Sequence, residues 1–533
     1  MGKEYPDFFN DVFGPVMQPG SSSHMAAPCR IGLLARALLG EEPVEASFIM
    51  DSQGSFAGTF GSMNEDKGML AGVLGIGPED ERLYDVYALA RLSSLKYRFA
   101  FDGMKESRHL NSLKVVLRSG SGKIAVLVAD STGGGMVRVR KINGFDVNLI
   151  GDTHVVFVFA AITSLQIQML IDAVGGYIGK KMVTDGGTTL VYLKFSEQPD
   201  IIGIRNLLPG VQIEFLAPIL PVAVKKARKK QLFKSVAEWR QISEQAGISM
   251  SETAVQYEMD SSLWTKEQVI TYMEKLKGIL TRQITAAYEG ANVVRTPFNR
   301  YDGGLWLDYQ SKGRVLSGPV MGKVIKRAIG VNEKTKKVPI VPGPMGTGGG
   351  YLFSALVSVR EAYGFGEDDL LRGLFVAAGI GAISYTHTNP TGEVVGCGGE
   401  CGVCCSMGAA AIVEMAGGNG VQIENAASLA LQAFIGLPCD PVIGGYEVPC
   451  FSRVIAASSM AVVYADLALA GCQAIIPYDE LLIALNQLGK NMPSELLCTS
   501  KGGSCLTPAA KRCAGEFKAW QRNQKDANGD FYE

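Results

Sequence analysis

The chain has 533 residues, 47% of them hydrophobic, and its 51 basic and 52 acidic residues leave a formal net charge of -1. A chain of this length and apolar content can bury large cores in two to four domains. Because the charges balance and form no long run of one sign, we expect no nucleic-acid partner and no anionic membrane surface.

Three further features indicate a cytoplasmic protein. Eleven cysteines, ten of them after residue 396, are spaced irregularly, which predicts reduced thiols rather than a secreted disulfide framework. The N-terminus has no apolar stretch of the kind that begins a secretory signal. The most membrane-like segment, 455–476, contains Tyr464, Asp466 and Gln473 and therefore predicts a buried helix rather than a membrane span.

The first 150 residues predict an α/β sandwich. Short runs at 46–50, 114–118 and 123–128 predict strands, and 85–95 predicts a helix. Glycines separate these segments, as in the turn at 131–135. We therefore expect a first domain over residues 1–150.

From residue 151 the pattern predicts a ferredoxin-like βαββαβ module over 151–224. The expected elements, in the order strand, helix, strand, strand, helix and strand, are 153–161, 163–174, 177–182, 188–195, 199–208 and 211–216. A module of this plan often senses a small molecule or forms a dimer. A purely structural spacer is the alternative.

A basic cluster at 225–230 marks the next boundary, and we interpret it as a solvated linker rather than a nucleic-acid contact. Long helical patterns follow, and charged positions become sparse after residue 350. The predicted helices are 233–246, 265–287, 352–363, 367–383, 404–416 and 454–470. Residues 225–533 thus predict one large, mostly helical domain, and the whole chain an α+β multidomain protein.

Three cysteines of the helical half, Cys397, Cys439 and Cys450, stand in unusual local sequences. Each is next to glycine or proline, where the backbone must bend to aim a side chain. Iron–sulfur clusters usually take four cysteines, so three would leave one iron open to a substrate as a Lewis acid. This pattern favours a cluster with elimination chemistry, and buried structural cysteines are the alternative.

A second cysteine spacing, Cys397-x3-Cys401-x2-Cys404, fits the cluster motif of radical-SAM enzymes. That motif requires a βα barrel after it, whereas the segment that follows predicts helices. We therefore expect Cys401, Cys404 and Cys405 to be core-facing or secondary thiols.

A glycine-led run near the N-terminus is a second candidate site. It contains Ser21, Ser22, Ser23 and His24, and consecutive hydroxyl and backbone N–H groups in such a loop suit a carboxylate. A flexible loop or a helix N-cap would explain the same run. The chain has only four histidines, so His24 and His387 are the candidates for acid–base chemistry.

These motifs resemble the iron–sulfur-dependent L-serine dehydratases, or L-serine ammonia-lyases, over nearly the whole chain. In the N-terminal part the segments resemble the β-type half of that family: DSQGSFA at 51–57, DKGMLAG at 66–72, TGGG at 132–135 and INGF at 142–145. In the C-terminal part they resemble the α-type half: GCGGE at 396–400, CDPV at 439–442, PCFSR at 449–453, PSEL at 493–496 and GG at 502–503. Segment 151–224 resembles the ACT-type module of the family.

The resemblance implies an oxygen-sensitive [4Fe–4S] cluster held by Cys397, Cys439 and Cys450. Its open iron would bind the hydroxyl and carboxylate of L-serine, and loss of water would give an enamine that ends as a keto acid and ammonia. The implied catalytic residues are His24 for proton transfer, Ser22 and Ser23 for the carboxylate, and Arg453 as an anion clamp. Further expected substrate contacts are Ser21, Ser55, Asp66 and Thr347. A homodimer and a small-molecule effector of segment 151–224 are expected partners.

Several positions near the expected substrate site depart from the family pattern. The family's Gly-His-Gly-Thr-Asp reads SMNED at 62–66, so an expected histidine is Met63. Its Ala-Pro-Thr-Asn-Gly loop reads GPMGT at 343–347, and Met25 and Val454 stand in place of threonine and asparagine. This pattern indicates a divergent member, and His387 is our hypothesis for the replacement of the missing histidine.

We therefore predict a carbon–oxygen lyase that dehydrates a small β-hydroxy α-amino acid, with L-serine as the default substrate. One alternative keeps the cluster but changes the substrate to L-cysteine, with loss of sulfide, or to a hydroxy acid without an amine. Another alternative is a non-catalytic cluster sensor or regulatory subunit, which would bind the cluster without turnover.

Overall fold

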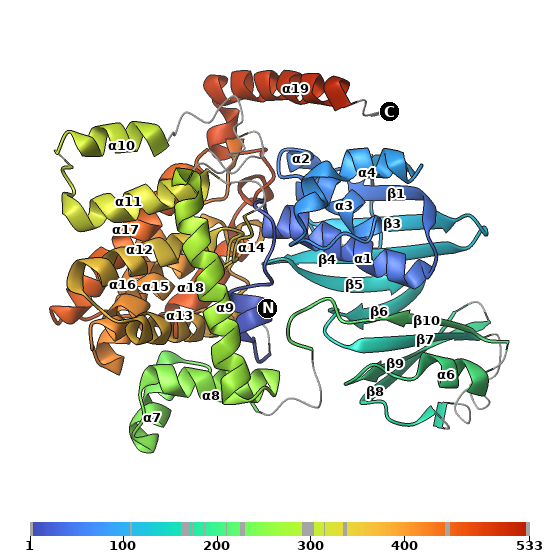
Figure 1. Ribbon diagram of the computed structural model, residues 1–533, viewed down its shortest axis with the longest axis horizontal. Helices are drawn as coiled ribbons and strands as arrows, with labels where there is room; N and C mark the ends of the chain where they lie inside the picture. The colour runs from blue at the N-terminus through green and yellow to red at the C-terminus, as the bar shows by residue number, and fades with distance from the viewer. Residues whose placement is uncertain are drawn as a thin grey trace.

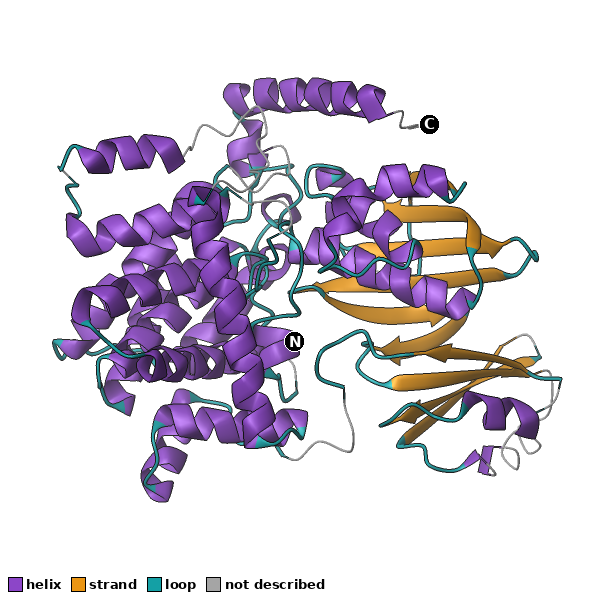
Figure 2. Ribbon diagram, viewed as in Figure 1, coloured by secondary structure: helices purple, strands orange, loops and turns teal. Residues whose placement is uncertain are grey.

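Two sheets with their helices form one side of the molecule, and a bundle of helices forms the other (Figure 1, Figure 2). The structure is a computed structural model that describes residues 4–106, 109–160, 171–172, 174–185, 187–208, 210–223, 230–289, 303–313, 315–333, 338–442 and 448–528. The expected mixture of α and β structure, with N-terminal sheets and a large helical C-terminal region, is confirmed.

The first sheet has six strands in the order β2-β1-β3-β4-β5-β6. Its strands are Pro43–Asp51 (β1), Lys96–Asp102 (β2), Ser112–Ser119 (β3), Ile124–Gly133 (β4), Met136–Ile142 (β5) and Phe145–Leu149 (β6). Strands β1 and β2 pair in parallel, and the other pairs are antiparallel. Alternate residues of β3, Leu113, Val115 and Leu117, are fully buried, as expected for a strand with one face on a core.

Helices cover one face of this sheet (Figure 1). They are Ala27–Leu39 (α1), Ser55–Thr59 (α2), Glu65–Val73 (α3) and Val86–Leu92 (α4). Helix α1 packs on β3, β4 and β5, and α3 packs on α1. The start of α1 is therefore fixed against the sheet, which matters because the predicted serine–histidine run precedes it directly.

The second sheet has the strand order of a ferredoxin-like βαββαβ unit, β10-β7-β9-β8, and all its pairs are antiparallel. Its elements are His154–Ala160 (β7), Gly179–Asp185 (β8), Thr188–Phe195 (β9), Ile201–Leu207 (α6) and Gln212–Leu216 (β10). Most of the first predicted helix, 163–174, lies outside the described residues, and so do positions 225–229 of the basic cluster. Phe157 and Leu216 join the core beneath α1, whereas Val191 packs with α6.

The C-terminal half is a bundle built around one buried helix, Cys397–Met415 (α15), of which every residue except Glu400 is buried. Helix α15 packs against Gly348–Tyr363 (α12), Glu367–His387 (α13), Gly420–Phe434 (α16) and Cys450–Leu469 (α17). The surrounding helices are Val236–Ala246 (α7), Met250–Ser262 (α8), Lys266–Thr285 (α9), Gly303–Ser311 (α10), Gly318–Asn332 (α11), Gly392–Val395 (α14), Tyr478–Asn491 (α18) and Pro508–Asn528 (α19).

Three of these helices begin earlier than the sequence pattern predicted, and one of them, α12, starts at Gly348 instead of 352. Helix α15 starts at Cys397 instead of 404, and α17 starts at Cys450 instead of 454. Glycine and proline lower the local tendency to form a helix, but tertiary packing overrides this preference. Gly398 fits against the backbone at Phe434, and Pro449 stands just before the first turn of α17. Both cysteines therefore sit at helix N-termini.

The N-terminal segment packs into the helical bundle rather than against the sheet. Phe8, Phe9 and Val12 of the short helix Phe8–Val12 (η1) are fully buried in the bundle core. The backbone N–H of Phe8 donates to the Glu258 carboxylate at 2.7 Å. Gly381 of α13 makes room for this segment, since a Cβ there would lie 2.2 Å from Val12 Cγ1.

Among the described residues, one helix, α17, has the length and apolar composition that could cross a membrane. It overlaps the segment 455–476 for which the sequence predicted a buried helix. In the structure α17 packs against α12, α15 and α16, but only 39% of its most apolar stretch is buried, less than the sequence predicted.

We predict that Gly381→Ala lowers the stability of the protein by about 1–3 kcal/mol, because the added methyl group overpacks a site that Val12 already fills. Gly278→Ala in α9 is the matched control, since a Cβ there meets no atom within 4 Å. The control should be neutral or stabilising by up to ~1 kcal/mol. Thermal unfolding followed by circular dichroism measures both changes, and equal midpoints for the two variants would contradict the packing described for η1.

Candidate functional site

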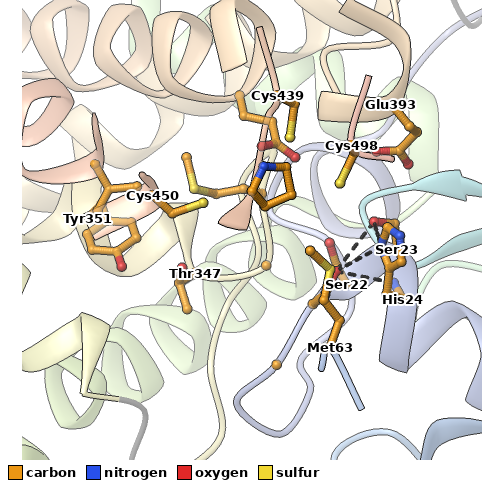
Figure 3. A pocket seen from close by; sticks show the side chains of 17 residues that line it. Ser22, Ser23, His24, Met63, Thr347, Tyr351, Glu393, Cys439, Cys450 and Cys498 are labelled. Atoms are coloured by element: carbon orange, nitrogen blue, oxygen red, sulfur yellow. Dashed lines mark hydrogen bonds between the residues drawn. The ribbon is translucent and has the colours of Figure 1, made fainter. Parts of the chain in front are cut away.

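A pocket lies between the sheet side and the helical bundle, and distant parts of the chain line it (Figure 3). The N-terminal turn and the loop before α12 form one part of the wall, and the cysteine segments form another. The lining residues are Gly20, Ser21, Ser22, Ser23, His24, Met63, Met345, Gly346, Thr347, Tyr351, Glu393, Glu400, Cys439, Pro441, Cys450, Val454 and Cys498.

The three cysteines predicted as ligands stand in two kinds of backbone setting. Cys397 and Cys450 are the first residues of α15 and α17, and a helix N-terminus favours a thiolate through its partial positive charge. Cys439 lies in an extended segment, where it forms an isolated bridge with Leu497. The Sγ atoms of Cys397 and Cys439 and a carboxylate oxygen of Glu400 all lie within 4.8 Å of one another.

The donor set fits a soft metal group. Cys439 and Cys450 line the pocket, Cys397 touches Cys439, and the thiols of Cys401 and Cys498 lie next to these. None of the eleven cysteines is in a disulfide. Sulfur ligands select zinc, copper(I) or iron–sulfur clusters over hard cations such as Mg²⁺. The pocket can therefore hold an iron–sulfur cluster.

Arg453 joins the cysteine segments to one another. Its Nη1 donates to the carbonyl of Pro438 at 2.7 Å and to Cys397 Sγ at 3.3 Å, and its Nη2 lies 2.8 Å from Asp440 Oδ1. Burial by itself would lower the pKa of the guanidinium, but the negative charges of Cys397 and Asp440 outweigh it and raise that pKa. Arg453 thus remains charged and positions the thiols.

The serine–histidine run forms a helical turn, Ser22–Ala26 (η2), that continues into α1 rather than a loop. Ser21 is its N-cap and accepts a hydrogen bond from the His24 backbone N–H at 3.2 Å. The hydroxyl of Ser131 in β4 donates to the carbonyl of Ser23 at 2.7 Å. These contacts fix Ser22 and Ser23 at the pocket wall.

The His24 ring is held by serine hydroxyls at both nitrogens. Nε2 lies 2.9 Å from Ser55 Oγ, and Nδ1 lies 2.9 Å from Ser23 Oγ. The Ser55 hydroxyl donates its only hydrogen to the Cys498 carbonyl at 2.6 Å, so its oxygen must accept a hydrogen bond from Nε2–H of His24. This pattern assigns the tautomer with hydrogen on Nε2, and Nδ1 accepts from a serine. Burial lowers the pKa of His24 to about 3, so the ring is neutral near pH 7.

Two carboxyl groups face the pocket from α14 and α15. Burial raises the pKa of Glu393 to about 7, although its contacts with Asn111 and Ser23 oppose the change. Burial and the neighbouring charges of Cys397 and Glu393 raise the pKa of Glu400 well above its usual range. The pocket thus holds carboxyl groups whose proton affinity is unusually high.

The structure brings some of the predicted residues to the pocket and places others elsewhere. Ser21, Ser22, Ser23, His24 and Thr347 line it. Ser55 stands one contact behind the wall, on His24, and Arg453 contacts Cys397, which itself lies behind Cys439. Two others lie outside the lining: the backbone N–H of Lys67 donates to Asp66 in α3 at 2.9 Å, and His387 Nε2 lies 2.8 Å from the carbonyl of Lys234.

Sequence reasoning did not identify Glu393, Glu400, Tyr351 or Cys498 as site residues. Glu400 belongs to the GCGGE motif, but the motif by itself does not indicate a role for this glutamate. The other three have no local signal, because each reaches the pocket only through the packing of segments far apart in the chain.

Comparisons with known proteins agree with this geometry. A family model described as "Serine dehydratase alpha chain" matches residues 240–504. The probable L-serine dehydratase alpha chain of Bacillus subtilis is 32% identical over 281 residues, which are 52% of this chain and 93% of that protein. L-serine dehydratase 1 of Escherichia coli is 30% identical over 281 residues, which are 51% of this chain and 62% of that protein.

A second kind of relative matches a shorter stretch. The L-serine dehydratase beta chain of Peptoniphilus asaccharolyticus is 32% identical over 142 residues, which are 27% of this chain and 63% of that protein. The cysteine-lined pocket and these similarities lead to one conclusion. The chain belongs to the iron–sulfur-dependent L-serine dehydratase family and is a carbon–oxygen lyase of the ammonia-lyase type.

Proposed function

We propose that this protein converts L-serine to pyruvate and ammonia with a [4Fe–4S] cluster in the pocket. The observation that carries the proposal is the meeting of cysteine thiols with serine and threonine hydroxyls around one cavity. When bound, a cluster held by three thiolates supplies a Lewis-acidic iron that helps the substrate hydroxyl to leave.

Cys397, Cys439 and Cys450 are the proposed ligands, because each begins or lies within a segment whose backbone is fixed by its neighbours. The backbone N–H of Cys439 donates to the backbone carbonyl of Leu496 at 2.8 Å. The backbone N–H of Cys498 donates to the backbone carbonyl of Cys439 at 2.7 Å. Arg453 acts behind them as a positioning residue, because it contacts Cys397 rather than the pocket itself.

The hydroxyl groups on the other wall suit the carboxylate of an amino acid. Ser22 is 4% exposed, Ser23 is 7% exposed and Thr347 is 7% exposed, so water competes little for their hydrogen bonds. Their donors would fix the substrate with its Cα and Cβ toward the cysteine side. His24 is the proposed organiser of this wall, since its neutral ring holds Ser23 and Ser55 in place.

The presence of Met63 in the pocket lining favours a second candidate substrate. Its side chain is 6% exposed and lines the pocket at the position where the resemblance predicted a histidine. A polarisable thioether suits a soft leaving group better than a hydroxyl does. L-cysteine, with loss of sulfide, is therefore the alternative to test after L-serine.

We also propose a cytoplasmic homodimer whose second sheet binds a small-molecule effector. The strand order β10-β7-β9-β8 supports an ACT-like module over 151–224, and the free thiols suit a reducing compartment. Measuring the mass in solution tests the homodimer. Repeating the measurement with candidate amino acids tests whether an effector changes the assembly.

The first test is anaerobic purification with a count of iron and sulfide, followed by addition of L-serine. We expect about four irons per chain, pyruvate release and a change in the EPR spectrum of the cluster. Four irons without product from L-serine would overturn the substrate, and release of sulfide from L-cysteine would identify the alternative. Absence of iron after reconstitution would overturn the cluster.

The ligand assignment predicts that Cys397→Ser, Cys439→Ser and Cys450→Ser each lose most of the iron. Turnover should fall by ~100-fold or more. The loss of a ligand should cost at least as much activity as the loss of a residue that only hydrogen-bonds to a ligand. Cys472→Ser is the matched control, because Cys472 is exposed and outside the pocket lining. A variant of the three that keeps its full iron content would remove that cysteine from the ligand set.

The hydrogen-bond pattern of His24 predicts that its ring stays neutral from pH 5 to 8, because burial lowers the pKa from 6.5 to about 3. Since the unfolded chain takes up a proton below 6.5, His24 costs stability as the pH falls from 6.5 towards 3. Nitrogen NMR of protein labelled in its four histidines should show an Nε2–H ring that is missing in His24→Gln. If the signal that disappears in His24→Gln titrated near pH 6.5 in the wild type, it would contradict this arrangement.

A further inference from the structure

Glu393 occupies a position in the pocket that the proposed roles leave unused. It lies in the short helix α14, four residues before Cys397, and only 5% of its side chain is exposed. The amide of Asn111 donates to its Oε1 at 3.2 Å. Figure 3 shows Glu393 beside Cys498, on the side of the pocket where Ser23 and His24 lie.

Dehydration of an amino acid requires a group that removes the α-proton, and most titratable residues of the pocket are unsuited to this. His24 has both ring nitrogens bound to serines. Tyr351 is fully enclosed, which raises the pKa of its hydroxyl far above neutral pH.

The remaining groups belong to the metal side of the pocket. Glu400 lies against the sulfur atoms of Cys397 and Cys439. The thiol of Cys498 contacts that of Cys439, one of the proposed ligands. Among the described residues that line the pocket, Glu393 is thus the carboxyl group that stands apart from the proposed ligands and next to the proposed carboxylate site.

We propose that Glu393 is the base that removes the α-proton of the substrate, an assignment that rests on the proposed function. The Glu393 carboxylate takes the proton, the C–H electron pair becomes the Cα=Cβ double bond, and the Cβ–O bond breaks. The proton finally joins the departing hydroxide, so L-serine becomes 2-aminoacrylate and water. The enamine then tautomerises and is hydrolysed to pyruvate and ammonia.

The surroundings of Glu393 suit a base that works near neutral pH. Burial raises its pKa to about 7, the range in which a general base combines availability with strength. The groups that face it are Asn111 before β3, Ser23 of η2, Thr391 before α14, Glu400 of α15, Tyr385 of α13 and Cys498. Burial opposes the ionisation of Glu393, whereas hydrogen bonds from Asn111, Thr391 and Ser23 favour it.

The test compares Glu393→Gln with the wild type in the iron-loaded enzyme. Glutamine keeps an oxygen for the Asn111 amide, so we expect unchanged iron content, an unchanged unfolding midpoint and an EPR response to L-serine like that of the wild type. We expect kcat to fall by ~10²–10⁴-fold, the usual contribution of a general base, while KM changes by only a few fold.

The pH profile separates a base from a structural residue. Wild-type kcat/KM should be lost as the pH falls through about 7, because Glu393 then becomes protonated. The residual activity of Glu393→Gln should lack this limb, and Glu393→Asp should restore part of the rate. Glu414→Gln is the matched control, because Glu414 in α15 is also buried, at 8% exposed, with a pKa raised by burial, but lies outside the pocket lining.

Each contrary result has a distinct meaning. Wild-type kcat and an unchanged acidic limb in Glu393→Gln would overturn the assignment. Parallel loss of iron, of the EPR response and of turnover would also overturn it, because Glu393 would then be a positioning residue. A wild type that binds iron but releases no product from L-serine or L-cysteine would instead contradict the proposed function.

Discussion

The geometry of the site depends on one guanidinium. Arg453 stands in the first turn of α17, whose first residue is Cys450, and donates to Cys397 Sγ at 3.3 Å and to the carbonyl of Pro438 at 2.7 Å. Its carboxylate partner, Asp440, also accepts from the backbone N–H of Ser504 at 2.7 Å. Every segment that carries a proposed ligand is tied to this charge. The ion pair is partly buried, with Arg453 17% and Asp440 4% exposed, and its loss would be costly, which favours one relative arrangement of the three thiols.

The pocket is complete only when both halves of the chain are in place. The helical half provides the thiols, whereas the sheet side provides the serines and His24. Ser55 donates to the carbonyl of Cys498 at 2.6 Å, and Asn389 donates to the carbonyl of Thr132 at 2.7 Å. This one polypeptide is similar both to an alpha chain and to a beta chain of relatives.

Burial sets the charge state of the pocket. It keeps the His24 ring neutral and raises the proton affinity of Glu393 and Glu400. The hydroxyl groups of Ser22, Ser23 and Thr347 are almost fully buried, so hydrogen bonds from them to a bound carboxylate would be weakly screened.

The sequence by itself determined the parts of the protein that depend on local pattern. Alternating apolar residues predicted β1, β3, β4 and the second sheet, and the glycine- and proline-flanked cysteines identified Cys397, Cys439 and Cys450 as a set. Helix periodicity located most of the bundle, although it placed the starts of α15 and α17 too late. Glycine and proline reduce local helix propensity, and only packing against distant segments compensates for that loss.

The tertiary structure alone decided which side chains share the pocket. The pocket brings together Ser23, Glu393 and Cys498. No local sequence pattern relates these residues, because they are far apart in the chain. His387 and Asp66 had suitable chemistry, yet the fold places both outside the pocket lining. The tertiary structure also decided the proton affinities of the pocket residues, because burial and neighbouring charges set them and exist only in the folded chain.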